Sequence, residues 1–223
     1  MKINSSTLQF LQGIAAHNDR DWFQQNKARF DAALANMQQF VKAVDAEMGK
    51  TDQLEGGGKL FRIYRDVRFS KDKSPYKNYF GASFKRATRL RRGGYYLHIE
   101  PGNAFAGGGF WEPNSQDLKR IRNEFAADDR PIRAIVSDPV FKKYFGKLEG
   151  GELKTAPGGF DRNHPAIDLL RKKQLVVKRP FSDQQVTGEN FLTEVRLTFE
   201  AMRPYFDYMS VVLTTNLDGE LLA

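Results

Sequence analysis

The chain has 223 residues, of which 40% are hydrophobic, 13% aromatic and 28% charged, and its net charge is +8. These proportions supply enough apolar side chains for a folded core, which excludes a disordered tail or a fibre. The chain contains no cysteine, which excludes disulfides, thiol catalysis, iron–sulfur clusters and thiolate zinc sites.

The first quarter of the chain has the apolar spacing of helices. Residues 7–14 predict a short amphipathic helix, and Asn18 or Asp19 can cap a second helix by accepting from its free backbone N–H groups. Apolar side chains then recur every three or four residues over 23–48, which predicts one long helix. The three glycines of 56–58 form a flexible connector, after which the apolar period changes to two.

The middle of the chain has the alternation of strands. Apolar and polar residues alternate over 60–69, so we expect a strand there. Turn-forming prolines and glycines separate three further candidates, over 79–85, 95–100 and 104–111. Short connections of this kind favour an antiparallel meander over parallel crossover units. We therefore expect an antiparallel sheet of about four strands.

The remainder of the chain returns mainly to helical spacing. Residues 114–115 can cap a helix, and Pro165 suits the first position of another. A last long helix is expected from about Glu189, with Pro204 kinking or restarting it. The other predicted elements are short helical segments over 132–136 and 141–145 and a brief strand over 175–177. The prediction is a single α+β domain over residues 1–223, with N- and C-terminal helices packed on the sheet.

The positive charge is concentrated in one segment. Residues 59–100 contain 12 basic and 3 acidic residues, a local net charge of +9. Such an excess attracts anions and favours phosphates, nucleic acid or an acidic partner. For residues 85–92, a solvated basic face that only aids solubility is an equally good interpretation.

Residues 62–77 hold the densest chemistry of the chain. On a strand, alternate side chains share one face, so four polar side chains would line up at intervals of about 6.5 to 7 Å. These four are Arg62, Tyr64, Asp66 and Arg68. Asp66 would accept hydrogen bonds from one or both arginines and leave their other N–H donors aimed at an anion. The pattern therefore predicts an anion clamp.

The loop that follows adds positive charge and a neutral donor. Lys71, Lys73 and Lys77 are point charges, and the Tyr76 hydroxyl can donate a hydrogen bond. Pro75 stiffens the backbone between them. Together with the clamp, the loop predicts a site for a small phosphorylated or carboxylated ligand.

Arg65 is the exception in this motif, because it falls on the face that is otherwise apolar. A buried cation needs a partner, so we expect an acidic residue from a helix that packs over the sheet. The alternative is that the whole Arg/Asp set is an architectural ion-pair network that holds helices to the sheet.

The third predicted strand carries a candidate acid or base. Tyr96, His98 and Glu100 share one parity. If the register places them beside Asp66, the group would supply a general acid or base next to the anion site. The alternative is that His98 is a structural histidine with satisfied hydrogen bonds.

A dedicated metal site is not expected. His17 and His98 are far apart in the sequence, and no histidine pair has helical spacing, which argues against zinc. Two or three carboxylates could still hold magnesium with a bound phosphate. The glycines of 107–109 lack the context of a nucleotide-binding loop and favour a bulge or a close backbone approach. The sequence identifies no cofactor.

The chain resembles the bacterial family catalogued as domain of unknown function 2461. The resemblance is carried by an Arg-x-x-Arg-Asp-x-Arg-Phe motif followed by Asp-Lys-x-x-Tyr. Its residues here are Arg62, Arg65, Asp66, Arg68, Phe69, Asp72, Lys73 and Tyr76. The resemblance extends over nearly the whole chain, as expected for a single-domain bacterial protein, and it implies no activity.

Three hypotheses for function follow from these residues. The first is a small anionic ligand bound by Arg62, Arg65, Arg68, Lys73 and Tyr76, with possible catalysis by Asp66, His98 or Glu100. The second is a nucleic-acid-binding module that uses residues 71–92 on phosphates and stacks bases on Tyr95, Tyr96 or Trp111, although aromatic residues this dense are also typical of a core. The third is a non-catalytic interaction protein with an architectural ion-pair network.

The cellular location is predicted from two absences. The first residues lack the uninterrupted apolar segment of a secretory signal. No run reaches the roughly 18 apolar residues that are needed to cross a bilayer. We therefore expect a cytoplasmic protein with no membrane partner.

Overall fold

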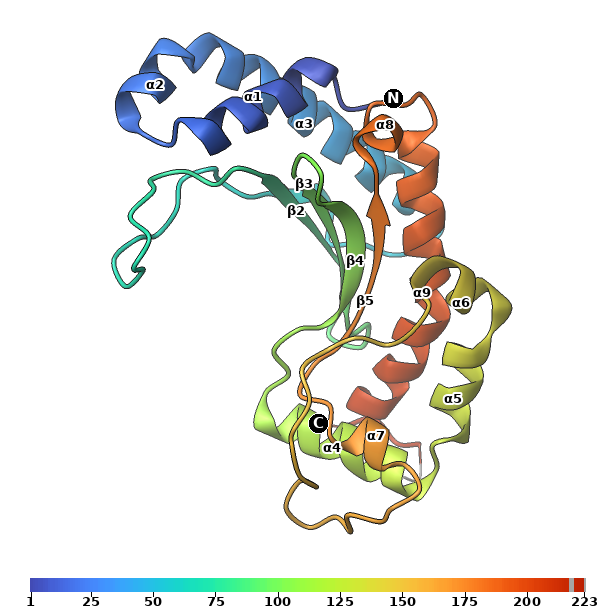
Figure 1. Ribbon diagram of the computed structural model, residues 1–223. Coiled ribbons are helices and arrows are strands. Elements are labelled where there is room, and N and C mark those ends of the chain that lie inside the picture. Colours follow the sequence, from blue (N-terminus) through green and yellow to red (C-terminus); the bar gives the residue numbers. More distant parts are fainter. Residues whose placement is uncertain (217–218, 223) are drawn as a thin grey trace. The chain divides into compact units, whose positions relative to one another are not determined.

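The computed structural model describes residues 1–216 and 219–222 of the chain. Within these residues the fold is α+β, with one open antiparallel sheet in the strand order β1-β2-β3-β4-β5 (Figure 1). The strands are β1 (Lys59–Leu60), β2 (Phe80–Lys85), β3 (Gly94–Ile99), β4 (Ala104–Phe110) and β5 (Leu175–Phe181). The predicted antiparallel meander is confirmed, and the brief strand predicted over 175–177 is longer than expected and joins the same sheet as β5.

The chain divides into two compact units, which we describe separately. Unit 1 contains Met1–Lys85, Tyr96–Ala106 and Pro180–Leu197. Unit 2 contains Arg86–Tyr95, Gly107–Arg179 and Thr198–Ala223. The single domain expected from the sequence stays a prediction.

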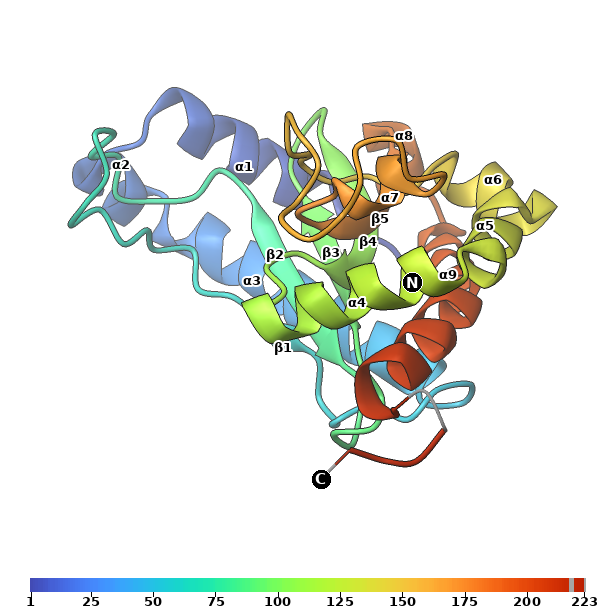
Figure 2. The same cartoon turned by 90° about the horizontal axis from the view of Figure 1, so that it is seen from below.

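Unit 1 contains the N-terminal helices. Its helices are α1 (Ser5–Ala16), α2 (Arg20–Gln25), α3 (Lys27–Met48) and α8 (Asp183–Val186). Helix α1 packs along α3, and α3 also contacts β1 and β2 (Figures 1 and 2). The side chain of Asp19 caps α2, as predicted. The expectation of one long helix up to residue 48 was wrong, because the Asn26 side chain bonds back to the Trp22 carbonyl (2.9 Å) and the chain turns there before α3 begins.

Unit 2 contains the later helices. They are α4 (Ser115–Ala127), α5 (Arg130–Ser137), α6 (Pro139–Phe145), α7 (Ile167–Leu170) and the part of α9 (Phe191–Thr214) from Thr198 onward. Helix α9 continues through Pro204 without restarting. The buried Tyr205 that follows donates to the Leu175 carbonyl (2.9 Å), which ties α9 to β5. The glycine at 109 allows the close backbone approach expected there, since a Cβ atom would lie 2.3 Å from the Leu175 oxygen.

The strand expected over 60–69 is reduced to β1, which ends at Leu60. The chain pairs with β2 only as far as Phe61, whose N–H donates to the Gly81 carbonyl (2.8 Å). It then leaves the sheet and folds back on itself, with an isolated bridge between Tyr64 and Tyr76. Because this bridge supplies the partner that a strand would have found in the sheet, the alternating pattern produces a loop with two paired arms. We call residues 61–77 the motif loop.

A solvated basic face was one of the two interpretations of residues 85–92, and for Arg86 it was wrong. Its side chain is only 1% exposed and lies in the core of unit 2. The guanidinium forms an ion pair with Asp207 and donates to the Arg92 carbonyl (3.2 Å) and the Ser210 hydroxyl (3.5 Å). Arg86 therefore stabilises unit 2. Arg89, by contrast, is exposed.

Among the described helices, none combines the length and the apolar character needed to span a bilayer.

Candidate functional site

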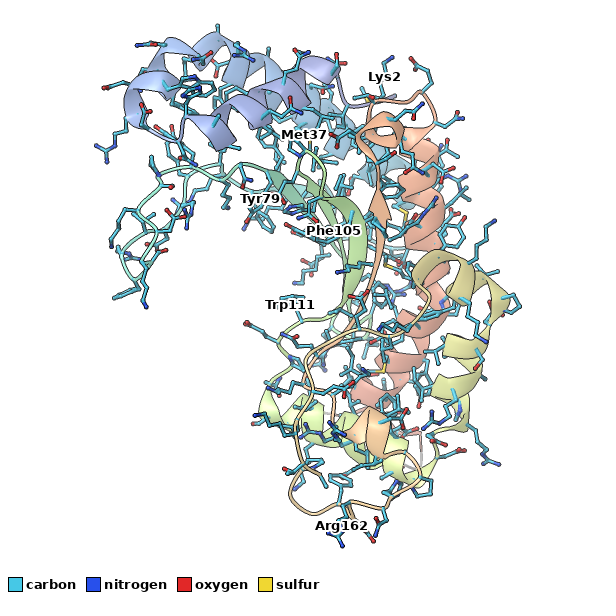
Figure 3. The ribbon with its side chains drawn as sticks, in the orientation of Figure 1. Lys2, Met37, Tyr79, Phe105, Trp111 and Arg162 are labelled. Carbon is cyan, nitrogen blue, oxygen red and sulfur yellow. The ribbon has the colours of Figure 1, made fainter. Side chains whose placement is uncertain are left out.

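The sheet residues of unit 1 alternate between a core face and an open face. On the core face, Phe80, Ala82 and Leu97 are fully buried. The opposite face carries half-buried rings, and Figure 3 labels two of them, Tyr79 and Phe105. We call this second surface the aromatic face, and it consists of the half-buried Phe61, Tyr79, Tyr96 and Phe105 together with His98, which is buried.

The His98 imidazole lies at the centre of the aromatic face. Its ring centroid is 4.3 Å from that of Tyr79 and 4.8 Å from that of Phe105, on which it stacks with an interplanar angle of 15°. Tyr96 lies 5.8 Å from Phe105 and 6.3 Å from Phe61. The rings therefore form one contiguous aromatic cluster rather than separate pairs.

A chain of hydrogen bonds runs along β3 through this aromatic cluster. The Tyr96 hydroxyl lies 3.1 Å from His98 Nδ1, and His98 Nε2 lies 3.0 Å from Glu100 Oε2. Glu100 also accepts from the side-chain amides of Asn78 and Asn103, each at 2.6 Å. The three residues thus lie on one side of β3, as their parity predicted, and they form one hydrogen-bonded chain.

Burial and hydrogen bonding determine which atoms of the Tyr96–His98–Glu100 chain carry protons. Burial raises the pKa of Glu100, but the hydrogen bonds from His98, Asn103 and Asn78 outweigh burial and hold it below its usual value. Burial lowers the pKa of His98 despite the opposing effect of Glu100. Because an ionised Glu100 can only accept, neutral His98 carries its proton on Nε2, and its Nδ1 accepts from the Tyr96 hydroxyl. Burial raises the pKa of Tyr96 to about 12, so this hydroxyl is neutral.

Gly81 of β2 provides the space for the Tyr96 hydroxyl. A Cβ atom at this position would lie 2.6 Å from the hydroxyl oxygen and 3.2 Å from the Phe61 ring. No other residue fits there without moving Tyr96, so Gly81 is a positioning residue for the hydrogen bond to His98.

One cation, Lys77, is shown to border the aromatic face. The ammonium group of Lys77 donates to the Arg62 carbonyl (2.9 Å) and lies 5.9 Å from the Phe61 ring and 5.8 Å from the Tyr79 ring. Burial, with a smaller effect of Arg62, lowers the pKa of Lys77. Within the described residues, Lys77 forms no ion pair with a carboxylate, so its charge is available to a ligand. The Arg62 side chain is exposed, and after the larger effect of Arg68 its charge helps to lower the pKa of Asp66.

The remaining arginines of the motif are paired inside the motif loop. Arg68 donates to both carboxylate oxygens of Asp66 (3.0 and 2.7 Å), as expected for this pair. Arg65 pairs with Asp72, so the prediction of a partner on a packed helix was wrong. The side-chain and backbone hydrogen bonds of Ser74, followed by that of Arg65, lower the pKa of Asp72 to about 2. The acidic partner comes from the loop because the loop folds back on itself.

The two other predicted ligand-binding residues also have contacts within unit 1. The ammonium group of Lys73 donates to the Val67 carbonyl (3.0 Å) across the motif loop. The ring of Tyr76 is buried and stacks on Phe23 of α2, with centroids 4.1 Å apart. Asn18 clamps the same residue, because its side chain donates to the Tyr76 carbonyl and accepts from the Tyr76 N–H.

The structure separates the predicted catalytic residues into two groups. His98 and Glu100 are hydrogen-bonded to each other, whereas Asp66 is exposed and bonded to Arg68. The residues that sequence reasoning missed are Phe61, Tyr79, Gly81, Phe105, Asn78 and Asn103. The predicted strands over 79–85 and 104–111 contained part of the signal, but only the register of neighbouring strands shows which side chains surround His98.

Two of the aromatic residues expected to stack bases, Tyr95 and Trp111, lie in unit 2. Tyr95 is buried in unit 2 against Phe199 and Phe206, so it cannot stack on a base. Trp111 of unit 2 is 64% exposed. Among the described residues, no group of three or more His, Asp or Glu side chains is arranged to hold a metal ion.

The pKa of His98 leads to a prediction about stability and pH. Because the folded state binds this proton only below the usual pKa of 6.5, the unfolded chain binds more protons at mildly acidic pH, and stability falls as the pH decreases. We expect the free energy of unfolding, measured with urea, to decline from about pH 6.5 downward. Glu100, whose pKa is also lowered, adds a further loss below about pH 4.5.

The control is His98→Gln, which cannot titrate. Its decline between about pH 6.5 and 5.5 should be smaller than that of the wild type. An unchanged decline in this variant would show that the effect does not come from His98.

The fold and site define the class of this chain. It is an α+β protein with an open antiparallel sheet, one face of which carries a hydrogen-bonded Tyr–His–Glu chain. The family model described as "Conserved hypothetical protein (DUF2461)" matches residues 6–208, so the chain belongs to this family. No curated protein and no solved structure matched the chain.

Proposed function

We propose that unit 1 binds a small ligand that carries an anionic group beside a flat ring, and that it moves a proton to or from this ligand. The observation that carries the proposal is the ammonium group of Lys77, which has no carboxylate partner among the described residues and lies next to the partly exposed rings of Phe61 and Tyr79. A ring of the ligand would pack on the aromatic face, and its phosphate or carboxylate would lie at Lys77.

The proton would move through the chain on β3. A ligand O–H or N–H group donates its proton to the Tyr96 oxygen, and Tyr96 passes its own proton to His98 Nδ1. The imidazolium that forms keeps its hydrogen bond to the Glu100 carboxylate, which stabilises the new charge. Tyr96 is neutral before and after the transfer, which agrees with its raised pKa. In this proposal the Asp66–Arg68 and Arg65–Asp72 pairs shape the motif loop.

The interaction-protein hypothesis explains less of unit 1. Ion pairs inside the motif loop are what an architectural network requires. That hypothesis gives no role to a lysine held between two rings without a carboxylate partner, or to the Tyr96–His98–Glu100 chain.

Thermal unfolding with a panel of sugar phosphates, nucleotides and aromatic carboxylates tests the proposal. We expect at least one compound to raise the melting temperature of the wild type, because a ligand that binds only the folded state stabilises it by RT ln(1 + [L]/Kd). Lys77→Met should lose most of this rise, since it keeps the stem but removes the charge. Lys42→Met, at an exposed position of α3, is the matched control and should keep it.

Two outcomes would overturn the proposal. One is a panel that leaves the wild type unmoved, and the other is an equal rise in wild type and Lys77→Met. For a compound that binds, Tyr96→Phe should change Kd little but lower any turnover by about 10²- to 10⁴-fold, the usual contribution of a positioned acid or base. Unchanged turnover in Tyr96→Phe would remove the proton-transfer part.

A further inference from the structure

The tip of the motif loop, residues 67–73, is a second surface that combines a ring with cations. Phe69 is 96% exposed, and the guanidinium of Arg68 lies 5.9 Å from its ring centroid. The side chains of Arg68, Lys71 and Lys73 are exposed around it. Leaving a phenylalanine ring in water forgoes the stabilisation that burial would give, and this asks for an explanation.

The tip is not exposed merely because the loop is loose. Both arms of the loop are paired, with the Arg65 N–H on the Pro75 carbonyl (2.9 Å) and the Lys77 N–H on the Ile63 carbonyl (2.7 Å). Asp72 joins the two arms through its ion pair with Arg65 and its hydrogen bonds to Ser74. The paired arms restrict the backbone that leads to Phe69, which lowers the entropy lost on binding.

The motif loop links this tip to the aromatic face. Lys77 and Phe61, at the two ends of the loop, border the aromatic face, and Phe69 is at its tip. The eight residue-to-residue steps from Phe69 to Lys77 span at most about 29 Å when fully extended. One ligand of several repeating units can therefore reach both surfaces within unit 1.

We propose that the ligand of the aromatic face is one part of a single-stranded nucleic acid, and that the strand continues along the motif loop to stack a base on Phe69. This inference rests on the proposed function and names the ligand class of the same site. Flat rings that alternate with anionic groups are the repeating unit of such a strand, and both surfaces present a ring beside a cation.

Other polyanions fit the two surfaces less well. An acidic peptide supplies charges but no regular series of flat rings. An anionic membrane would interact with the basic tip, but the single exposed ring of Phe69 offers little apolar area to insert. The nucleic-acid-binding site proposed here also differs from the one expected from the sequence. It contains the aromatic face and Phe69, and it does not contain Tyr95 or Arg86, which are both buried.

Fluorescence anisotropy with a labelled single strand of about 12 nucleotides tests the inference, since such sites take about 4–16 nucleotides. We expect the wild type to bind it with a steep salt dependence. Phe69→Ala should weaken the affinity about 5- to 150-fold, the effect of losing one stacked base. Lys77→Met should weaken the binding of both the strand and a nucleoside monophosphate, whereas Phe69→Ala should leave the monophosphate unaffected.

Trp111→Ala, which removes an exposed ring from unit 2, is the matched control and should bind like the wild type. Equal binding of the strand by Phe69→Ala and wild type would overturn the inference. So would a wild type that binds the monophosphate but not the strand, and this outcome would leave the proposed function in place. Binding to phosphatidylserine vesicles or polyglutamate in preference to the strand would also overturn it.

Discussion

Replacing Arg86 by alanine is expected to lower the free energy of unfolding by about 3–5 kcal/mol, because it leaves a cavity and removes the donor from the Arg92 carbonyl and the Ser210 hydroxyl. The side chain is almost completely buried and pairs with Asp207. It also donates to the Arg92 carbonyl and the Ser210 hydroxyl, and its guanidinium lies 5.7 Å from the Phe206 ring. Urea unfolding followed by circular dichroism measures the loss.

Two control variants separate the causes of this loss. Arg86→Met fills most of the volume without a charge, and Asp207 is 54% exposed and can be hydrated, so this variant should lose clearly less than Arg86→Ala. Arg89→Ala, at an exposed position of the same segment, should stay within about 0.5 kcal/mol of the wild type. If Arg86→Ala matched Arg89→Ala in stability, the role of Arg86 in the core of unit 2 would be refuted.

Replacing Tyr76 by alanine is expected to cost about 3–5 kcal/mol, the usual effect of deleting a buried aromatic ring. The ring is 4% exposed, stacks on Phe23 and lies 5.4 Å from the Tyr64 ring. These contacts hold the base of the motif loop against α2. Amide hydrogen exchange should therefore speed up across the motif loop in Tyr76→Ala, while urea unfolding gives the loss of stability.

Tyr76→Phe is the matched control for this variant. It keeps the stacked ring and removes only a hydroxyl, whose pKa is raised chiefly by burial. We expect it to remain close to the wild type in stability and in hydrogen exchange. A large loss in Tyr76→Phe would mean that the hydroxyl, rather than the ring, anchors the loop.

Local patterns predicted the fold where the determining contacts are close in sequence. Helical spacing located α3 and α9, and the cap residues Asp19 and Asn114 bond as expected. The strand over 60–69 was wrong because its alternation is the same whether the partner is a sheet or the returning arm of a loop. The break at Asn26 and the burial of Arg86 depend on contacts that spacing does not encode.

The same limit applies to the candidate site. Residue parity was sufficient to group Tyr96, His98 and Glu100, since they lie on one strand. Tyr79 and Phe105 come to His98 from other parts of the sheet, so their positions depend on register. The partner of Arg65 could not be predicted because it depends on how the loop folds back to bring Asp72 close.

The fixed tautomer of His98 also determines the reactivity of its imidazole toward chemical reagents. Its Nε2 carries a proton held by Glu100, and the lone pair of Nδ1 accepts from Tyr96. Alkylating or acylating compounds need a free imidazole lone pair, so His98 should be inert toward them until the bond to Tyr96 opens. The rate of its chemical labelling would thus report how often that opening occurs.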